Sequence, residues 1–141
     1  DANRRFIEMY GYRCNLLTDT EVITYIVDYL VRKQGLTLTE MANVIAAPFW
    51  STISRKPQAE KERLTFLRNA FSSLLITGPF SILLGFEGGL LALNDRLKLR
   101  SMVVGEKDDM VYIASEESAI RVVEPYVEKV WSPRGAEAYN G

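Results

Sequence analysis

The sequence predicts an α+β fold in which helices come first and antiparallel strands follow. Before Gly78, apolar residues recur mainly at three- and four-residue spacing, which is typical of helices with one buried face. After Gly78, they come in short runs separated by turn residues, which is typical of strands joined by hairpins. The length of 141 residues, with 48% hydrophobic and 25% charged residues, indicates one folded domain over residues 1–141.

The first predicted helix covers residues 20–34. We expect Thr18 and Glu21 to form a capping box at its start and Gly35 to supply the left-handed residue that ends it. Its buried face is predicted from six apolar residues: Val22, Ile23, Ile26, Val27, Leu30 and Val31.

Two further helices are predicted before the strands begin. A second capping box, Thr37 with Glu40, starts a short helix that Pro48 closes. Residues 49–58 are expected to form a bend with a helical turn, and Pro57 is expected to be the first residue of a longer helix. The inner face of that helix is predicted to consist of Leu64, Leu67, Phe71 and Leu74.

Four strands, a short helix and a last turn and strand make up the rest of the prediction. Residues 87–89 and 107–109 are expected to be hairpin turns, so neighbouring strands should pair antiparallel. The apolar runs read as strands are residues 80–86, 90–93, 102–104 and 110–113, with the short helix at 116–122 and the last unit around Pro133-Arg134-Gly135.

Composition excludes several classes of function. The 17 basic and 18 acidic residues give a net charge of −1, so a nucleic acid is not expected as the main partner. The absence of histidine excludes a histidine-dependent catalytic triad and a histidine-ligated metal within this chain. We expect no metal or other cofactor in this segment.

The expected location is the cytoplasm. The single cysteine, Cys14, cannot form an intrachain disulfide, which favours a reducing compartment. The first residues lack the apolar core of a signal peptide. Glycine, proline and charge interrupt the apolar stretch at residues 72–93, so no membrane span is expected.

Two local segments are candidate sites. Asp19 is not needed for the capping box at residues 18–21, and a carboxylate fixed at a helix start can pair with a ligand ammonium; helix capping alone is the other interpretation. The run at residues 95–100 is predicted to be a solvated turn with an internal Asp–Arg pair, in which Asp95, Arg96 and Arg100 are structural. Cys14 is expected to be a small buried residue and not a nucleophile.

Four motifs, in order and spacing, resemble the C-terminal half of the class-II glutamine amidotransferase domain. The helix pair, the Trp50 region and the Leu-Lys-Leu-Arg run are most similar to the amidotransferase component of archaeal-type glutamate synthases. The motifs are Thr18-Asp19-Thr20-Glu21-Val22-Ile23, Gly78-Pro79-Phe80-Ser81-Ile82, Asn94-Asp95-Arg96 through Arg100 to Val103-Val104-Gly105, and Ile113-Ala114-Ser115-Glu116.

This resemblance implies part of an N-terminal nucleophile hydrolase fold, a four-layer sandwich of two antiparallel sheets between helical layers. It also implies hydrolysis of glutamine to glutamate and ammonia, with ammonia passed to a synthase domain or subunit for glutamate synthesis. The family's nucleophile is an N-terminal cysteine assisted by its own α-amine, so no histidine is required. Asp19 matches the aspartate that binds the α-amino group of glutamine.

The chain departs from the family in its catalytic parts. Residue 1 is Asp, Cys14 is internal, and the family's Asn-Gly oxyanion element and its arginine for the glutamine carboxylate lie upstream of residue 1. We therefore assign no catalytic residue to the chain and expect no glutaminase activity from it alone. The family's Arg-Asp-Pro-x-Gly-x-Arg-Pro-Leu pattern is replaced at residues 94–102.

Exposed strand edges are expected to associate with the missing N-terminal half or to produce an oligomer. Two alternatives to an active amidotransferase part stay open. One is a non-catalytic scaffold or regulatory relative of the same fold, in which Asp19 only caps a helix. The other is an unrelated α+β binding module.

Overall fold

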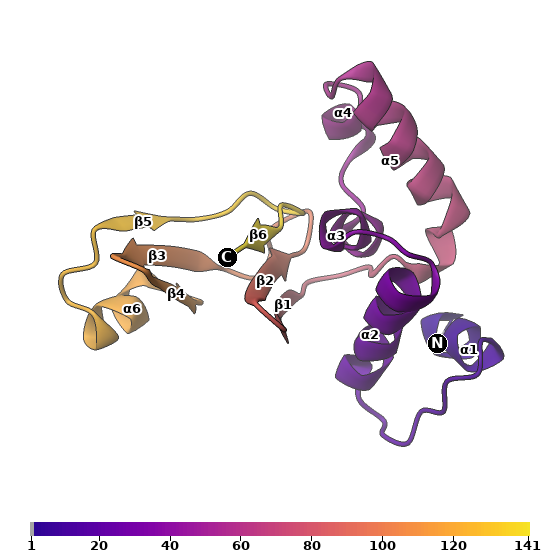
Figure 1. The fold of residues 1–141 in the computed structure, drawn as a ribbon, viewed down its shortest axis with the longest axis horizontal. Coiled ribbons are helices and arrows are strands. Elements are labelled where there is room, and N and C mark those ends of the chain that lie inside the picture. Colours follow the sequence, from indigo (N-terminus) through magenta and orange to yellow (C-terminus); the bar gives the residue numbers. More distant parts are fainter. Residues whose placement is uncertain (1) are drawn as a thin grey trace. The chain divides into compact units, whose positions relative to one another are not determined.

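The computed structural model describes residues 2–141 and has the predicted order, helices followed by small antiparallel sheets (Figure 1). The chain divides into two compact units, a helical unit that ends at Ile76 and a sheet unit from Thr77 to Gly141. The α+β class is thereby confirmed. Within residues 2–141, no helix has the length and apolar character needed to cross a membrane.

Over residues 2–76, the described part of the helical unit, there are five α-helices, one π-helical turn and one 3₁₀ turn. The helix predicted at residues 20–34 is present, although its last five residues take the π form. The elements are α1 (Ala2–Met9), α2 (Asp19–Asp28), η1 (Tyr29–Lys33), α3 (Leu38–Ala46), α4 (Trp50–Ile53), α5 (Gln58–Ala70) and η2 (Ser72–Leu74).

Gly35 ends the π turn as predicted. Its φ of +72° lies in the left-handed region, which glycine adopts without a steric penalty. The amide of Leu36 then donates to the carbonyl of Leu30 at 3.0 Å, which satisfies one of the carbonyls left unpaired at the helix end. The chain can therefore turn directly into the next helix.

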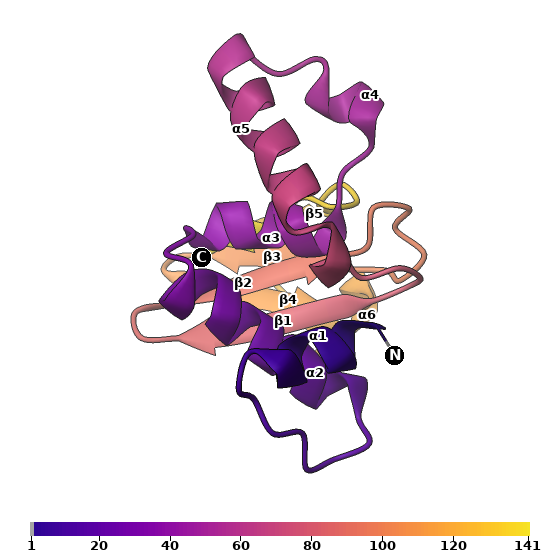
Figure 2. The same cartoon turned by 90° about the vertical axis from the view of Figure 1, so that its right-hand side faces the viewer.

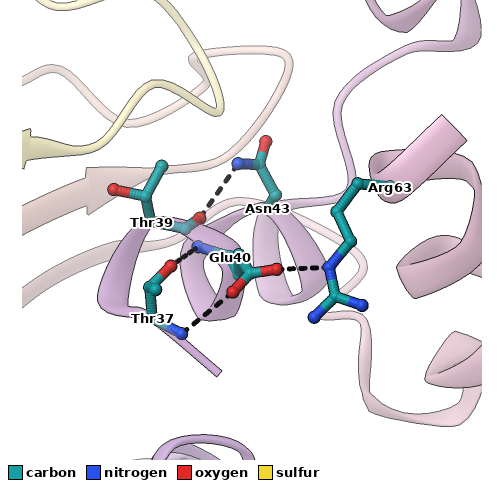
Figure 3. Close-up of polar contacts among 5 residues, drawn as sticks. All are labelled: Thr37, Thr39, Glu40, Asn43 and Arg63. Carbon is teal, nitrogen blue, oxygen red and sulfur yellow. Dashed lines mark hydrogen bonds and ion pairs between the residues drawn. The ribbon is translucent and has the colours of Figure 1, made fainter. Parts of the chain in front are cut away.

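The capping box of α3 is also present (Figure 3). The Thr37 hydroxyl accepts from the amide of Glu40 at 3.1 Å, and the Glu40 carboxylate accepts from the amide of Thr37 at 3.2 Å. The second Glu40 oxygen lies 2.6 Å from Nε of Arg63 on α5, so one carboxylate caps α3 and joins it to α5. The hydrogen bond from Arg63 is the main cause that lowers the pKa of Glu40.

The helical unit differs from the sequence prediction at several places. Phe71 and Leu74, predicted on the inner face of the longer helix, lie beyond the end of α5 at Ala70. Pro57 precedes α5 instead of starting it, because its ψ of 150° is not helical.

Helix α1 was not predicted at all. It is short, and Ile7 is its one fully buried residue, with Phe6 packing edge-on against Tyr29 at 5.7 Å between ring centroids.

The sheet unit contains two three-stranded antiparallel sheets and helix α6 (Glu117–Val123). The four predicted strands form two antiparallel hairpins, β1 with β2 and β3 with β4, and Figure 2 shows β1 and β2 side by side. One sheet has the order β1 (Ser81–Phe86), β2 (Gly89–Asn94), β6 (Tyr139–Asn140), and the other has the order β4 (Met110–Ala114), β3 (Val103–Lys107), β5 (Lys129–Trp131).

Helix α6 packs against β3 and β4, and Gly105 allows it to come close. A Cβ atom at Gly105 would lie 3.0 Å from Val127 and 3.1 Å from Ile120, both of which are buried. A larger residue at this position would force the helix and the segment after it away from the sheet.

Candidate functional site

Asp19 is the first residue of α2, and its side chain is exposed. Thr18 before it has an extended backbone, with φ −98° and ψ 142°, as an N-cap residue requires. Asp19 and Glu21 both lie in the first turn, where the helix dipole favours negative charge. The structure thus presents the Asp19 carboxylate to solvent at a helix N-terminus.

The capping box predicted for Thr18 and Glu21 is wrong. The Thr18 side chain makes no capping hydrogen bond. The Glu21 carboxylate instead accepts from the amides of Asn15 and Leu16, at 2.8 and 2.6 Å. Its two oxygens bind the preceding loop, and so they do not close a box with the residue at the cap.

Glu21 therefore fixes the loop that leads into Asp19. The backbone hydrogen bond from Asn15 is the first cause that lowers the pKa of Glu21, and the bond from Leu16 acts in the same direction. The hydroxyl of Tyr25, one turn along α2, lies 3.4 Å from Glu21 Oε1 and 3.2 Å from the carbonyl of Arg13. The loop is thus anchored to α2 from two sides just before Asp19.

A second group of contacts, which the sequence analysis missed, holds the start of the same loop. The Tyr12 hydroxyl donates to Asp28 at 2.5 Å, and Arg32 pairs with the same carboxylate at 2.9 Å. The Lys33 ammonium lies 4.2 Å from the centre of the Tyr12 ring. Burial and the hydrogen bond to Asp28 raise the pKa of Tyr12 to about 12, so the phenol stays a donor. The i,i+4 spacing of Asp28 and Arg32 was the sequence pattern that could have predicted their ion pair.

Cys14 lies in the loop between these anchors and is half-buried. Burial is the main cause that raises the pKa of its thiol, and Glu8 and Glu21 add to this effect while Arg4 opposes it. A raised pKa disfavours the thiolate, which is the nucleophilic form. Cys14 is less buried than predicted, and its lack of a nucleophilic role stays a prediction.

The run at residues 95–100 is a turn, but Asp95 is not solvated as predicted. Its side chain is 3% exposed and accepts hydrogen bonds from four backbone amides. Oδ1 accepts from Leu97 and Leu99 at 3.1 and 3.0 Å, and Oδ2 accepts from Arg100 and Phe80 at 3.3 Å each. Burial raises the pKa of Asp95, but these four donors outweigh it and the net shift is downward. The structural assignment of Asp95 therefore agrees with the geometry.

Lys98, within this turn, has a φ of +54°. This left-handed conformation is strained for a residue with a Cβ atom and is free of strain for glycine. The position is also the one at which the amidotransferase pattern has glycine.

We expect Lys98→Gly to raise the free energy of unfolding by about 0.5–1 kcal/mol, because relief of strain exceeds the entropy that glycine adds to the unfolded chain. Urea denaturation of the two proteins measures this difference. Lys61→Gly, inside α5 where the backbone is ordinary, is the matched control and should destabilise the chain. A Lys98→Gly chain that is no more stable than the parent would contradict the strain argument.

Among residues 2–141, no three His, Cys, Asp or Glu side chains are placed to hold a metal ion. The structure brings Asp19, Glu21 and Tyr25 to one end of α2, while Asp95 lies in the sheet unit. The candidate binding residue is therefore Asp19, on a loop and helix that Glu21 holds in place.

Comparison with known proteins finds one informative relative. The chain is 43% identical over 140 residues to an uncharacterized protein of Archaeoglobus fulgidus. The match covers 99% of this chain and 37% of the relative, so the chain spans little more than a third of that protein's length. No family model and no solved structure matches the chain.

Proposed function

We propose that residues 1–141 are the C-terminal portion of a class-II glutamine amidotransferase domain in which Asp19 binds the α-amino group of glutamine. The observation that carries the proposal is the ordered set of four motifs, which begins with Thr18-Asp19-Thr20-Glu21. The exposed carboxylate of Asp19 at the start of α2 supports it, because such a group can pair with an ammonium ion.

The arrangement around Asp19 is suited to binding. A carboxylate binds a ligand more tightly when its backbone is held rigidly, since less conformational entropy is then lost on binding. The two loop amides bound by Glu21 and the hydroxyl of Tyr25 supply this rigidity. The role proposed for Asp19 is binding and orientation, and no catalytic residue is assigned to the chain.

The proposed parent protein is an amidotransferase of the archaeal glutamate synthase type, with a four-layer sandwich of which this chain is one part. It would hydrolyse glutamine and pass ammonia to a synthase domain or subunit in the cytoplasm. The archaeal relative, which is uncharacterized, shows only that a similar segment occurs within a longer protein.

Ammonia release from glutamine tests the proposal. We expect a longer polypeptide that contains residues 1–141 together with the upstream half to release ammonia and glutamate in equal amounts. The chain of residues 1–141 should release none above a buffer blank, because it holds no N-terminal cysteine. Turnover by residues 1–141 alone would contradict the assignment of the nucleophile to the upstream half. If the longer polypeptide releases no ammonia, the alternative of a non-catalytic relative is favoured.

A further inference from the structure

Negative charge is concentrated in one part of the sheet unit. Residues 106–129 contain seven acidic and three basic residues, an excess of four negative charges in a chain whose net charge is −1. The three basic side chains each pair with an acid of the same segment: Lys107 with Glu124 at 2.9 Å, Arg121 with Glu117 at 2.7 Å, and Lys129 with Glu106 at 4.0 Å. The excess is carried by the remaining acids, Asp108, Asp109, Glu116 and Glu128.

Four exposed apolar side chains lie in the same segment, and we call them the α6 surface: Met110, Val122, Val123 and Tyr126. They are 58%, 82%, 71% and 79% exposed. Single exposed apolar residues are common on soluble proteins, whereas several together commonly mark an interaction site. The question is therefore whether these four are neighbours.

The register of the sheet places Met110 beside one ion pair. Lys107 and Met110 are directly opposite across β3 and β4, so their side chains lie on the same face of the sheet. Gly105, two residues before Lys107, marks that face as the one on which α6 packs. The Lys107 ammonium is 2.9 Å from Glu124 and 5.5 Å from the centre of the Tyr126 ring.

The remaining two members adjoin this ion pair along the chain. Val122 and Val123 form the end of α6 immediately before Glu124. Asp108 and Glu128 are close enough to Lys107 that their charges, after the hydrogen bond to Glu124, help to raise its pKa. Met110 and Tyr126 thus lie beside the Lys107–Glu124 pair, and the charges of Asp108 and Glu128 act on the same lysine.

We propose that the α6 surface docks a protein segment whose apolar side chains are flanked by lysine or arginine. The apolar residues would bury area on contact, and the acids of the same segment would attract basic side chains and set their register. The same surface of a second copy is a poorer occupant, since a symmetric pair would bring two acidic segments together. This inference is independent of glutamine binding.

The test uses the chain of residues 1–141 and a dye-labelled amphipathic peptide of leucine and lysine, with binding followed by fluorescence anisotropy. A peptide in which glutamate replaces lysine is the control for charge. We expect the Leu/Lys peptide to bind, the Leu/Glu peptide not to bind, and added salt to weaken the complex.

Two double variants separate apolar contact from simple charge attraction. Val123→Ser with Tyr126→Ser should weaken binding about tenfold or more, because exposed aromatic and aliphatic anchors carry much of the energy of an interface. Leu97→Ser with Leu99→Ser is the matched control, since both leucines are 60% exposed in the same unit outside the α6 surface, and it should bind as the parent does. Trp131 fluorescence, in a Trp50→Phe background, checks that each variant remains folded.

Four outcomes would overturn the proposal. The first is that the Leu/Lys peptide does not bind. The second is that both double variants bind it as tightly as the parent does. The third is that, of all the variants, only a further one, Asp108→Asn with Asp109→Asn, weakens binding, which would indicate charge attraction alone. A concentration-dependent dimer in light scattering that disappears in Val123→Ser with Tyr126→Ser would also overturn it and assign the surface to a second copy.

Discussion

Replacing Asp95 with alanine is expected to destabilise the sheet unit by about 3–4 kcal/mol, the largest effect on stability that we expect from a polar substitution in this chain. The carboxylate is buried and serves four backbone amides, three in its own turn and one on Phe80. Without it, these donors lose their charged acceptor in a place that water reaches poorly. Urea denaturation followed by Trp131 fluorescence, in a Trp50→Phe background, measures the loss.

The same interaction predicts a dependence of stability on pH. The pKa of Asp95 is lowered in the folded state, so its contribution is complete above the ordinary value of 3.8 and is lost as the pH falls through the folded value. The stability difference between the parent and Asp95→Ala should therefore be constant near neutral pH and shrink in acid. Asp95→Asn keeps one acceptor oxygen, so its free energy of unfolding should lie between those of the parent and Asp95→Ala.

Glu87→Ala, in the exposed β1–β2 turn, is the control for Asp95→Ala and should change the free energy of unfolding by less than about 0.5 kcal/mol. If Asp95→Ala does not fold, Asp95→Asn still allows the comparison. A loss below about 1 kcal/mol for Asp95→Ala, or a difference that does not vary with pH, would contradict the role given to the four amides.

The helix ends show which parts of the fold were predictable. The stop at Gly35 and the box of Thr37 with Glu40 were predicted correctly, because both depend on hydrogen bonds between residues close in sequence. The box of Thr18 with Glu21 has the same sequence form and was predicted wrongly. There the amides of Asn15 and Leu16, in the loop before α2, donate to the Glu21 carboxylate.

The parts of the fold that the sequence did not predict depend on contacts between residues distant in sequence or on unusual backbone conformations. Helix α1 carries too few apolar residues to be read alone, and it is buried through Ile7 and through the contact of Phe6 with Tyr29. The turn at Asp95 was read as solvated because its composition is polar. Its burial follows from backbone donors, which composition does not show, and from a left-handed Lys98 where glycine would have signalled the turn.

The sequence indicated where the candidate site lies, but it did not show which residues hold Asp19 in place. The exposed position of Asp19 at a helix start follows from local pattern alone. The residues that hold it there, Glu21 and Tyr25 on α2, act on a loop whose path the sequence does not reveal. A single sequence therefore indicates which carboxylate to test, whereas the structure indicates why its backbone is fixed.

Asp19→Asn is expected to lower kcat/KM for glutamine about 30- to 1,000-fold in the longer polypeptide, which corresponds to the loss of about 2–4 kcal/mol from a charged hydrogen bond to an ammonium group. The asparagine is nearly the same size, and the loss of one exposed charge from the first turn of α2 should cost less than about 1 kcal/mol, so the protein should still fold. Initial rates of ammonia release at varied glutamine measure the effect. Glu60→Gln, an exposed acid in the first turn of α5, is the matched control.

Glutaramate, which is glutamine without its α-amino group, makes the assignment specific. If Asp19 binds that amino group, the parent should strongly prefer glutamine, and Asp19→Asn should lose this preference while hydrolysing glutaramate at the parent's rate. An equal fall with both substrates would mean that Asp19 supports the fold of the site and does not bind the ammonium. Because the amide keeps the helix start and removes only the negative charge, a selective loss for glutamine would identify charge pairing as the role of Asp19.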